Sequence, residues 1–308
     1  KSLREEQGKL EEILGSPAAL KRTLIREIEA DAKAHGDDRR TLVQEEKRAV
    51  AEIKVVDEPV TVVVSLKGWV RALKGHEVDP ATLAFKAGDG LYGSFACRSV
   101  DPLLVFGSAA GGSAWVYSVA GASLPGGRGA GPPITSLIEL ETGTQPAHYY
   151  AGANETMLLL ANTGGFGLLA RVADMMARNR SGRSFLSVDD AQQVLPPAVV
   201  AVGHGQVACL SLSARLLVFA LDVPLDLGRD AGDAAGGRGL ALRDVDHKGP
   251  LVSVASFGEQ LKLLGQGRSA KAKEETLRGA ALAEHVGKRA RKGRKCGGFV
   301  KLMRLAAD

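Results

Sequence analysis

The stretch EPVTVVVSLKGWVRALKGH, residues 58–76, decides the fold of this chain. It begins with an apolar, β-branched run at residues 60–64, which favours an extended strand. Residues 65–68 form a short turn that ends in a glycine, and Trp69 opens a second β-prone run. Two short runs of this kind around a glycine-bearing turn are typical of an antiparallel hairpin.

Four later stretches repeat this pattern of two apolar runs around a turn. They cover residues 103–119, 157–172, 207–221 and 251–264. The turn centres are roughly 45–55 residues apart, a period typical of propellers, solenoids and other repeat arrays. We therefore expect a mainly β fold, with a five-bladed β-propeller over residues 58–308. Radial repetition leaves few exposed sheet edges, which suits a glycine-rich chain in solution.

The N-terminal residues have a helical pattern instead. Leucines lie on one stripe of a helix over residues 1–14. Ser16 is a favourable N-cap for a second helix over residues 18–34, and residues 42–53 fit a third short helix. Because this region is small and polar, we expect residues 1–57 to be the helical end of a larger upstream domain, followed by a linker.

Positive charge is concentrated near the C-terminus. The chain has a net charge of +5, and residues 262–304 alone contain 13 Lys or Arg but only 3 Asp or Glu. A dense basic run is a typical footprint for a polyanion. Six cations occupy eight positions here: Lys288, Arg289, Arg291, Lys292, Arg294 and Lys295. The alternative is a solvated tail, although the alternating CGGFVKLMRL at residues 296–305 favours a strand.

The segments between hairpins are rich in glycine and arginine. They include LPGGRGAGPP at 124–133, ARNRSGRS at 177–184, DAAGGRG at 233–239 and GKRARKGRKCGG at 287–298. Glycine allows the backbone to approach a phosphate closely, and arginine forms charge-assisted contacts with it. The alternative is that these segments only connect blades. Outside the run of six, the predicted polyanion contacts are Lys67, Arg71, Lys74, Arg128, Arg178, Arg180, Arg183, Arg215 and Arg238.

The sequence contains no recognisable catalytic or metal-binding motif. Its three cysteines are far apart, and its six histidines lack the short spacing of metal ligands. GQGRSAK at residues 265–271 departs from the phosphate-binding P-loop pattern. No apolar run approaches the roughly 20 residues that span a membrane. We therefore expect no catalytic residue, metal or cofactor in this chain, and a propeller enzyme is the least favoured alternative.

These residues resemble the A subunits of bacterial type IIA topoisomerases. AHGDDRRT at 34–41 is similar to the end of their helical gate. Residues 58–79 are similar to the opening of the C-terminal β-propeller, or β-pinwheel, of topoisomerase IV A subunits, and LPP at 195–197 and ARNRSGRS also fit. Gyrase A subunits are the nearest relatives, but KGHEVD at 74–79 stands where gyrase has its glutamine-, arginine- and glycine-rich box. This departure favours topoisomerase IV and implies less DNA wrapping.

The resemblance implies a DNA-binding domain that presents duplex DNA to a whole enzyme, which relaxes supercoils and decatenates chromosomes with ATP and Mg²⁺. The implied partners are double-stranded DNA, the B subunit of topoisomerase IV and a second copy of the A subunit, at the nucleoid in the bacterial cytoplasm. The family's catalytic tyrosine follows an arginine in an upstream domain. None of Tyr92, Tyr117, Tyr149 and Tyr150 does so here. Alternatives are a protein-interaction propeller without DNA affinity and the equivalent domain of the gyrase A subunit.

Overall fold

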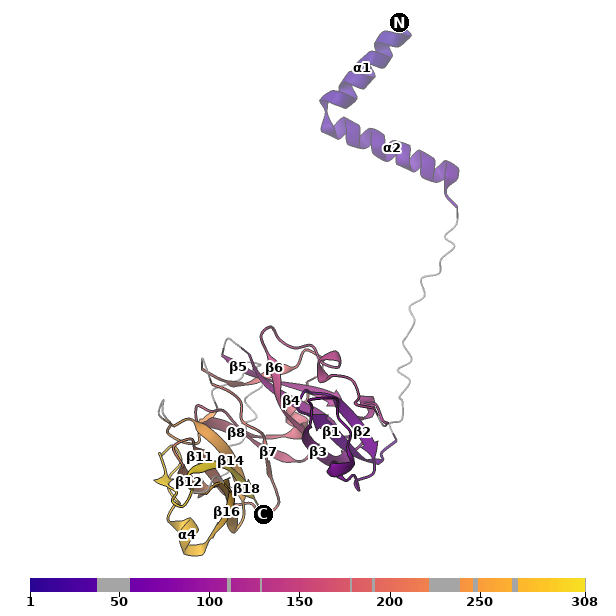
Figure 1. The fold of residues 1–308 in the computed structure, drawn as a ribbon. Helices are drawn as coiled ribbons and strands as arrows, with labels where there is room; N and C mark the ends of the chain where they lie inside the picture. Colours follow the sequence, from indigo (N-terminus) through magenta and orange to yellow (C-terminus); the bar gives the residue numbers. More distant parts are fainter. Residues whose placement is uncertain are drawn as a thin grey trace. The chain divides into compact units, whose positions relative to one another are not determined.

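The computed structural model describes residues 1–37, 56–109, 112–127, 129–177, 179–189, 192–221, 239–245, 249–267 and 271–307. The chain divides into two compact units, Lys1–Ile53 and Lys54–Asp308. The described part of the first unit is helical, and the second unit consists mainly of strands (Figure 1).

Two helices make up the described part of the first unit: α1 (Ser2–Gly15) and α2 (Pro17–His35). The side chain of Ser16 accepts a hydrogen bond from the backbone N–H of Ala19 and so caps α2. Both expected helices are therefore confirmed. The third helix expected at residues 42–53 lies outside the described residues.

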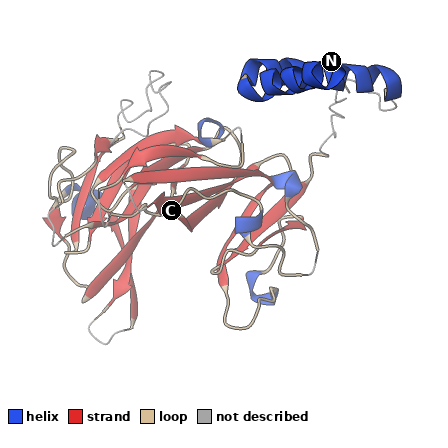
Figure 2. Ribbon diagram, turned by 90° about the horizontal axis from the view of Figure 1, so that it is seen from above, coloured by secondary structure: helices blue, strands red, loops and turns tan. Residues whose placement is uncertain are grey.

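The second unit is a five-bladed propeller of small antiparallel sheets (Figure 2). From the outer to the inner edge, blade 1 contains β2 (Val70–Lys74), β1 (Pro59–Ser65) and β3 (Leu91–Arg98). Blade 2 contains β9 (Arg183–Ser187), β5 (Ser113–Ala120), β4 (Pro102–Ala109) and β6 (Gln145–Ala151). Blade 3 contains β13 (Leu240–Ala241), β8 (Phe166–Arg171), β7 (Met157–Ala161) and β10 (Ala198–Val200).

Blades 4 and 5 complete the row. Blade 4 contains β17 (Arg294–Lys295), β12 (Arg215–Ala220), β11 (Gln206–Ser211) and β14 (Leu251–Phe257). Blade 5 contains β16 (Ala272–Arg278), β15 (Gln260–Gln266) and β18 (Lys301–Ala307). Short helices α3 (Val172–Met175) and α4 (Gly279–Ala283) follow β8 and β16. The described residues also contain 3-10 turns at Pro80–Thr82, Gly121–Ser123 and Ile134–Ser136.

After each later hairpin the chain returns to the preceding blade. In this way β9, β13 and β17 each follow the hairpin of one blade but join the sheet of the blade before it. Residues 125–134 do the same for blade 1, where the N–H groups of Val70 and Ala72 donate to the carbonyls of Pro132 and Pro125. We call these the covering segments: 125–134 for blade 1, 179–187 for blade 2, 239–243 for blade 3 and 285–296 for blade 4.

Each covering segment contains one glycine with a positive φ that lies tight against the blade it covers. These are Gly131, Gly182, Gly239 and Gly293. A Cβ on any of them would lie under 3.0 Å from a carbonyl oxygen of the outer hairpin strand, those of Val70, Val116, Gly167 and Leu216 respectively. Glycine is required here because it alone tolerates both the conformation and the close approach. These glycines therefore allow the backbone of each covering segment to pack against the outer hairpin strand of its blade.

In the part of the chain that is described, four hydrophobic cores join successive blades. One core holds residues of blades 1 and 2, and a second holds residues of blades 2 and 3. A third lies between blades 3 and 4, and the fourth between blades 4 and 5. Inner strands of neighbouring blades also contact one another: β3 with β6, β10 with β14, and β14 with β18. Within the described ranges no such core joins blade 5 to blade 1.

The expected five-bladed propeller is confirmed, but one expected hairpin is wrong. The sequence pattern pairs the two apolar runs of residues 251–264, whereas β14 pairs with β11 of blade 4 and β15 pairs with β16 of blade 5. Gly258 therefore lies in a connection between blades. A glycine such as Gly258 predicts that the chain turns, but it does not predict which strands pair on either side of the turn. The basic C-terminal region ends in a strand, as expected.

Candidate nucleic-acid interface

The covering segments follow one another along the outer edge of blades 1–4. The N–H of Glu139, shortly after the first segment, donates to the carbonyl of Arg180 in the second. Gly239 of the third segment lies next to Leu186 of the second. The N–H of Ala290 in the fourth segment donates to the carbonyl of Leu242 in the third. The structure thus brings segments that are far apart in sequence into one continuous edge.

The fourth covering segment carries the densest charge on this edge. Its backbone is fixed at both ends, because the N–H of Gly287 donates to the carbonyl of Val218 and that of Cys296 to the carbonyl of Ala214, each at 2.8 Å. Between these points β17 pairs with β12. Its six cations are all exposed: Lys288, Arg289, Arg291, Lys292, Arg294 and Lys295. They are therefore presented by an ordered part of the blade 4 sheet and not by a free tail.

Arg243 holds the fourth covering segment from inside the protein. Its side chain is buried, with 4 % exposed. The guanidinium donates hydrogen bonds to the carbonyls of Arg215, Lys292 and Cys209. Arg215 adds a bond from its exposed side chain to the carbonyl of Gly293 at 3.1 Å. Sequence reasoning missed Arg243, since nothing in LALRDV marks its arginine as buried.

Arg71 in β2, a predicted DNA contact, has a similar structural role in blade 1. Only 5 % of the residue is exposed. Its guanidinium donates to the carbonyl of Gly129 in the first covering segment and to that of Ala84 at 3.3 Å. A buried guanidinium needs such partners because an unsatisfied one is costly. Arg71 therefore holds a covering segment in place.

The two described arginines predicted in the second covering segment also bond to the backbone. Arg180 donates to the carbonyls of Leu137, at 3.0 Å, and Ser136, at 2.6 Å. Arg183 donates to the carbonyl of Asp174. Both residues are exposed, so their outer faces remain open to solvent. Each charge is used in part to fix the segment to the protein.

The remaining predicted contacts are dispersed. Lys67 is exposed at the turn between β1 and β2. Lys74 is exposed at the end of β2, and its ammonium lies 3.7 Å from the carboxylate of Glu58. Arg128, Arg178 and Arg238 lie outside the described residues. The structure brings together the six cations of the fourth segment, and it places Lys67 and Lys74 in blade 1.

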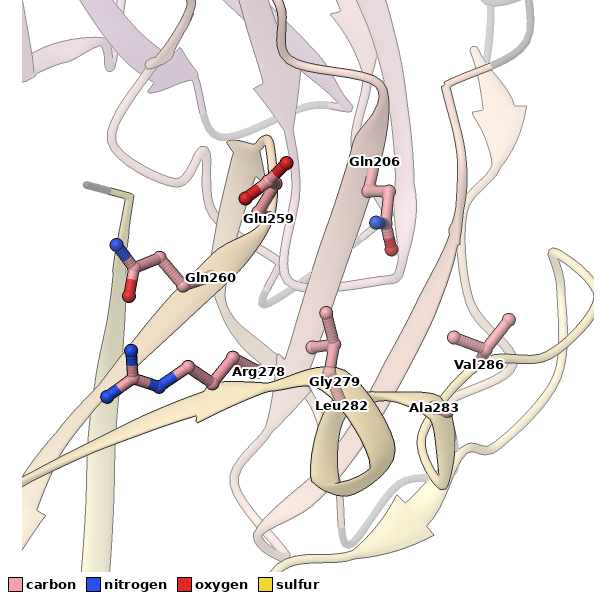
Figure 3. Close-up of a pocket in the computed structure, with 8 residues that line it drawn as sticks. All are labelled: Gln206, Glu259, Gln260, Arg278, Gly279, Leu282, Ala283 and Val286. Atoms are coloured by element: carbon pink, nitrogen blue, oxygen red, sulfur yellow. The ribbon is translucent and has the colours of Figure 1, made fainter.

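A pocket of about 630 Å³ lies between blades 4 and 5 (Figure 3). Leu282 and Ala283 of α4, together with Val286, give it an apolar side. Its polar lining residues are Gln206, Glu259, Gln260 and Arg278. Figure 3 shows Gln260 and Arg278 next to each other on one side and Val286 on the opposite side. Because one carboxylate and one guanidinium line the pocket, it suits a protein side chain better than a chain of phosphates.

The described residues offer no centre for metal or thiol chemistry. None of their His, Cys, Asp and Glu side chains form a group of three that could hold a metal ion. The three cysteines are buried free thiols, and burial raises the pKa of Cys209 to about 12. Cys97 and Cys296 have pKa values raised by burial to about 11. In the parts of the chain that are described, no helix combines the length and apolar character needed to cross a bilayer.

The sequence of this chain is similar to those of several known proteins. The A subunit of DNA topoisomerase 4 from Neisseria gonorrhoeae is 36% identical over 295 residues, which are 94% of this chain and 37% of that protein. The corresponding protein of Pseudomonas aeruginosa is 32% identical over 312 residues, covering 99% of this chain and 40% of that protein. The chain is homologous to the A subunit of DNA topoisomerase IV.

Solved structures agree with this homology to topoisomerase IV. The E. coli ParC C-terminal domain matches with a TM-score of 0.66 and 25% identity, over 81% of this chain and 98% of that domain. The DNA gyrase A C-terminal domain shares the fold, with a TM-score of 0.55 and 16% identity. No family model matches the chain. The chain spans about two fifths of the length of its two topoisomerase IV relatives.

Proposed function

We propose that this chain is the C-terminal DNA-binding domain of the A subunit of a topoisomerase IV, and that it binds duplex DNA along its outer edge. The fourth covering segment carries this proposal, because six exposed cations stand on a backbone that is fixed to blade 4. A fixed row of cations suits the regular phosphates of a duplex, and each contact releases counterions. Such contacts position the DNA and do not read its sequence.

The exposed cations of the fourth segment form the main part of the proposed surface. Lys67, Lys74, Arg128, Arg178 and Arg238 remain proposed contacts, and Arg180, Arg183 and Arg215 are proposed as weaker ones because their guanidinium groups also bond to carbonyls. Arg71 is left out of the surface because it is buried. The proposed DNA path therefore depends more on blade 4 than on the other blades.

We further propose that the whole enzyme relaxes supercoils and decatenates chromosomes in the bacterial cytoplasm, at the nucleoid. Its partners would be the B subunit of topoisomerase IV and a second copy of the A subunit, joined through an upstream domain. ATP and Mg²⁺ would act elsewhere in that enzyme, and we assign neither to a residue of this chain. KGHEVD at residues 74–79 supports less DNA wrapping than in gyrase, because it lacks the gyrase box.

A second function, docking of another protein, is favoured by the pocket between blades 4 and 5. Its apolar side and mixed charges fit a protein side chain. Filter binding of the 308-residue chain to duplexes of random sequence, over a salt series, separates the two functions. We expect binding that varies little with sequence and weakens steeply with salt. Absence of DNA binding at about 50 mM salt would overturn the proposed DNA-binding function and would leave protein docking as the remaining one.

A further inference from the structure

The outer strand of blade 5 lacks the covering segment that blades 1–4 have. In those blades a later part of the chain pairs with β2, β5, β8 or β12 on its outer side. Strand β16 is the equivalent strand of blade 5, and it ends its sheet. Within the described ranges, no other segment forms a backbone hydrogen bond with its outer side. One strand position of the propeller is therefore left vacant by the described residues, and we call it the vacant position.

One hydrogen bond fixes which way the backbone groups of β16 point. The N–H of Gly267 donates to the carbonyl of Lys271 at 3.0 Å, in register with the pairing of β15 and β16. Hydrogen-bonded pairs alternate with non-bonded pairs along an antiparallel ladder. The odd-numbered residues of β16 therefore bond to β15. Glu274 and Thr276, between them, direct their N–H and C=O groups to the vacant side.

Glu274 occupies the position that meets a covering glycine in other blades. The central strand shifts register after Val64 in blade 1 and after Leu210 in blade 4. The outer-strand partners of these two residues are Val70 and Leu216, whose carbonyls the covering glycines approach. Blade 5 has the same shift after Leu264, and the partner of Leu264 is Glu274. The vacant position thus has the backbone layout of an occupied one.

The charge at this position indicates what could fill it. Glu274 is exposed, whereas the equivalent Val70 and Leu216 are buried. Its neighbours Lys273 and Glu275 already form an ion pair at 3.0 Å, and Glu274 forms no ion pair with another described residue. All four covering segments are basic and contain glycine. An exposed carboxylate on the vacant edge would complement a segment of the same kind.

We propose that the outer edge of β16 binds an extended, basic, glycine-containing segment of another protein, which adds as the fourth strand of blade 5. Main-chain hydrogen bonds with Glu274 and Thr276 would hold the segment, as in other cases of strand addition. The Glu274 carboxylate would select a basic side chain near the segment's glycine. Charged side chains along β16 also disfavour unselective pairing of this edge with another apolar edge.

The test uses a labelled peptide, NRSGRSFLS, which copies residues 179–187 of the covering segment of blade 2. Its binding to the 308-residue chain is measured by fluorescence anisotropy. Thr276→Pro removes an N–H that points to the vacant side, a position where proline is tolerated, and Thr276→Ala is the matched control. We expect equal affinity for wild type and Thr276→Ala, and a loss of about tenfold or more for Thr276→Pro.

Two further measurements define the site. Amide exchange at Glu274 and Thr276 should slow when the peptide is added, and a peptide with both arginines changed to glutamate should bind several-fold more weakly, as should the original peptide to Glu274→Gln. Thr276→Pro should keep the wild-type circular dichroism and DNA affinity. Failure of the wild type to bind the peptide, or equal binding by Thr276→Pro and Thr276→Ala, would overturn the proposal.

Discussion

The covering segments of blades 2 and 4 have the same place in the fold but use their charges in opposite directions. In blade 2, Arg180 and Arg183 of the segment reach inward to carbonyls of the protein. In blade 4, Arg215 and Arg243 of the protein reach outward to carbonyls of the segment. The segment's own cations are then left exposed. A count of arginines therefore overstates the charge that is available to a ligand.

The largest effect on stability is expected from replacing Arg243, the buried arginine that holds the fourth covering segment. Arg243→Met removes the donor to the carbonyl of Lys292 and the shorter of two bonds to that of Arg215, so we expect a loss of about 3 kcal/mol in the free energy of unfolding. Arg215→Met is the control, because Arg215 is exposed and donates one bond to Gly293. It should lose about 0.5–1 kcal/mol in the same urea titration. Equal losses would show that Arg243 does not anchor the segment.

A smaller effect is expected in blade 2, where the segment's own arginines form the anchors. The double variant Arg180→Met, Arg183→Met should lose about 1–2 kcal/mol of stability by urea unfolding. Its DNA affinity should keep a salt dependence within about one unit of the wild-type slope. A fall in slope of two units or more with unchanged stability would reverse the comparison and place the DNA on blade 2.

The smallest effect concerns acid, because blade 2 and the fourth covering segment each contain a partly buried histidine. Burial lowers the pKa of His148 in β6 below its ordinary value of 6.5. Burial also lowers the pKa of His285 in the fourth segment, and nearby Arg294 adds to the fall while Glu284 opposes it. The unfolded chain then binds more protons, so stability falls as pH decreases through about 6.5 and levels off below the folded-state pKa.

Thermal unfolding from about pH 7 to about pH 5 measures this loss. His148→Gln and His285→Gln should each lose less stability over that range than the wild type does. Glutamine keeps a hydrogen-bonding amide at each site and cannot take up the proton. A variant that loses as much as the wild type would show that its histidine does not contribute to acid sensitivity.

The sequence predicted the blades better than it predicted the edge between them. Four of the expected hairpins are correct, because in each of them the two paired strands lie in one short stretch of sequence around a turn. The covering strands are short and pair across long separations; β17, for example, has two residues and pairs with β12. No local pattern records such a pairing. This is also why residues 251–264 were assigned to one hairpin although they join two blades.

The sequence shows the basic run at residues 288–295, but it does not show that Arg215 and Arg243 hold the backbone of this run in place. An arginine in a polar stretch has the same sequence pattern whether its guanidinium is exposed to solvent or donates to a backbone carbonyl. Arg71 and Arg243 each donate to a carbonyl about 50 residues away, that of Gly129 and that of Lys292, as well as to nearer carbonyls. The roles of individual arginines therefore depend on tertiary contacts, which composition and spacing do not encode.

The salt dependence of DNA binding tests the central claim most directly. In one variant the six cations of the fourth covering segment are changed to Gln. A control variant of equal charge changes six exposed cations of the first unit to Gln: Lys1, Arg4, Lys9, Lys21, Arg26 and Lys33. We predict that the slope of log K against log salt falls by about 2–4 units in the first variant and by less than about one unit in the control. An unchanged slope in the first variant, or equal falls in both, would contradict a DNA path along the fourth covering segment.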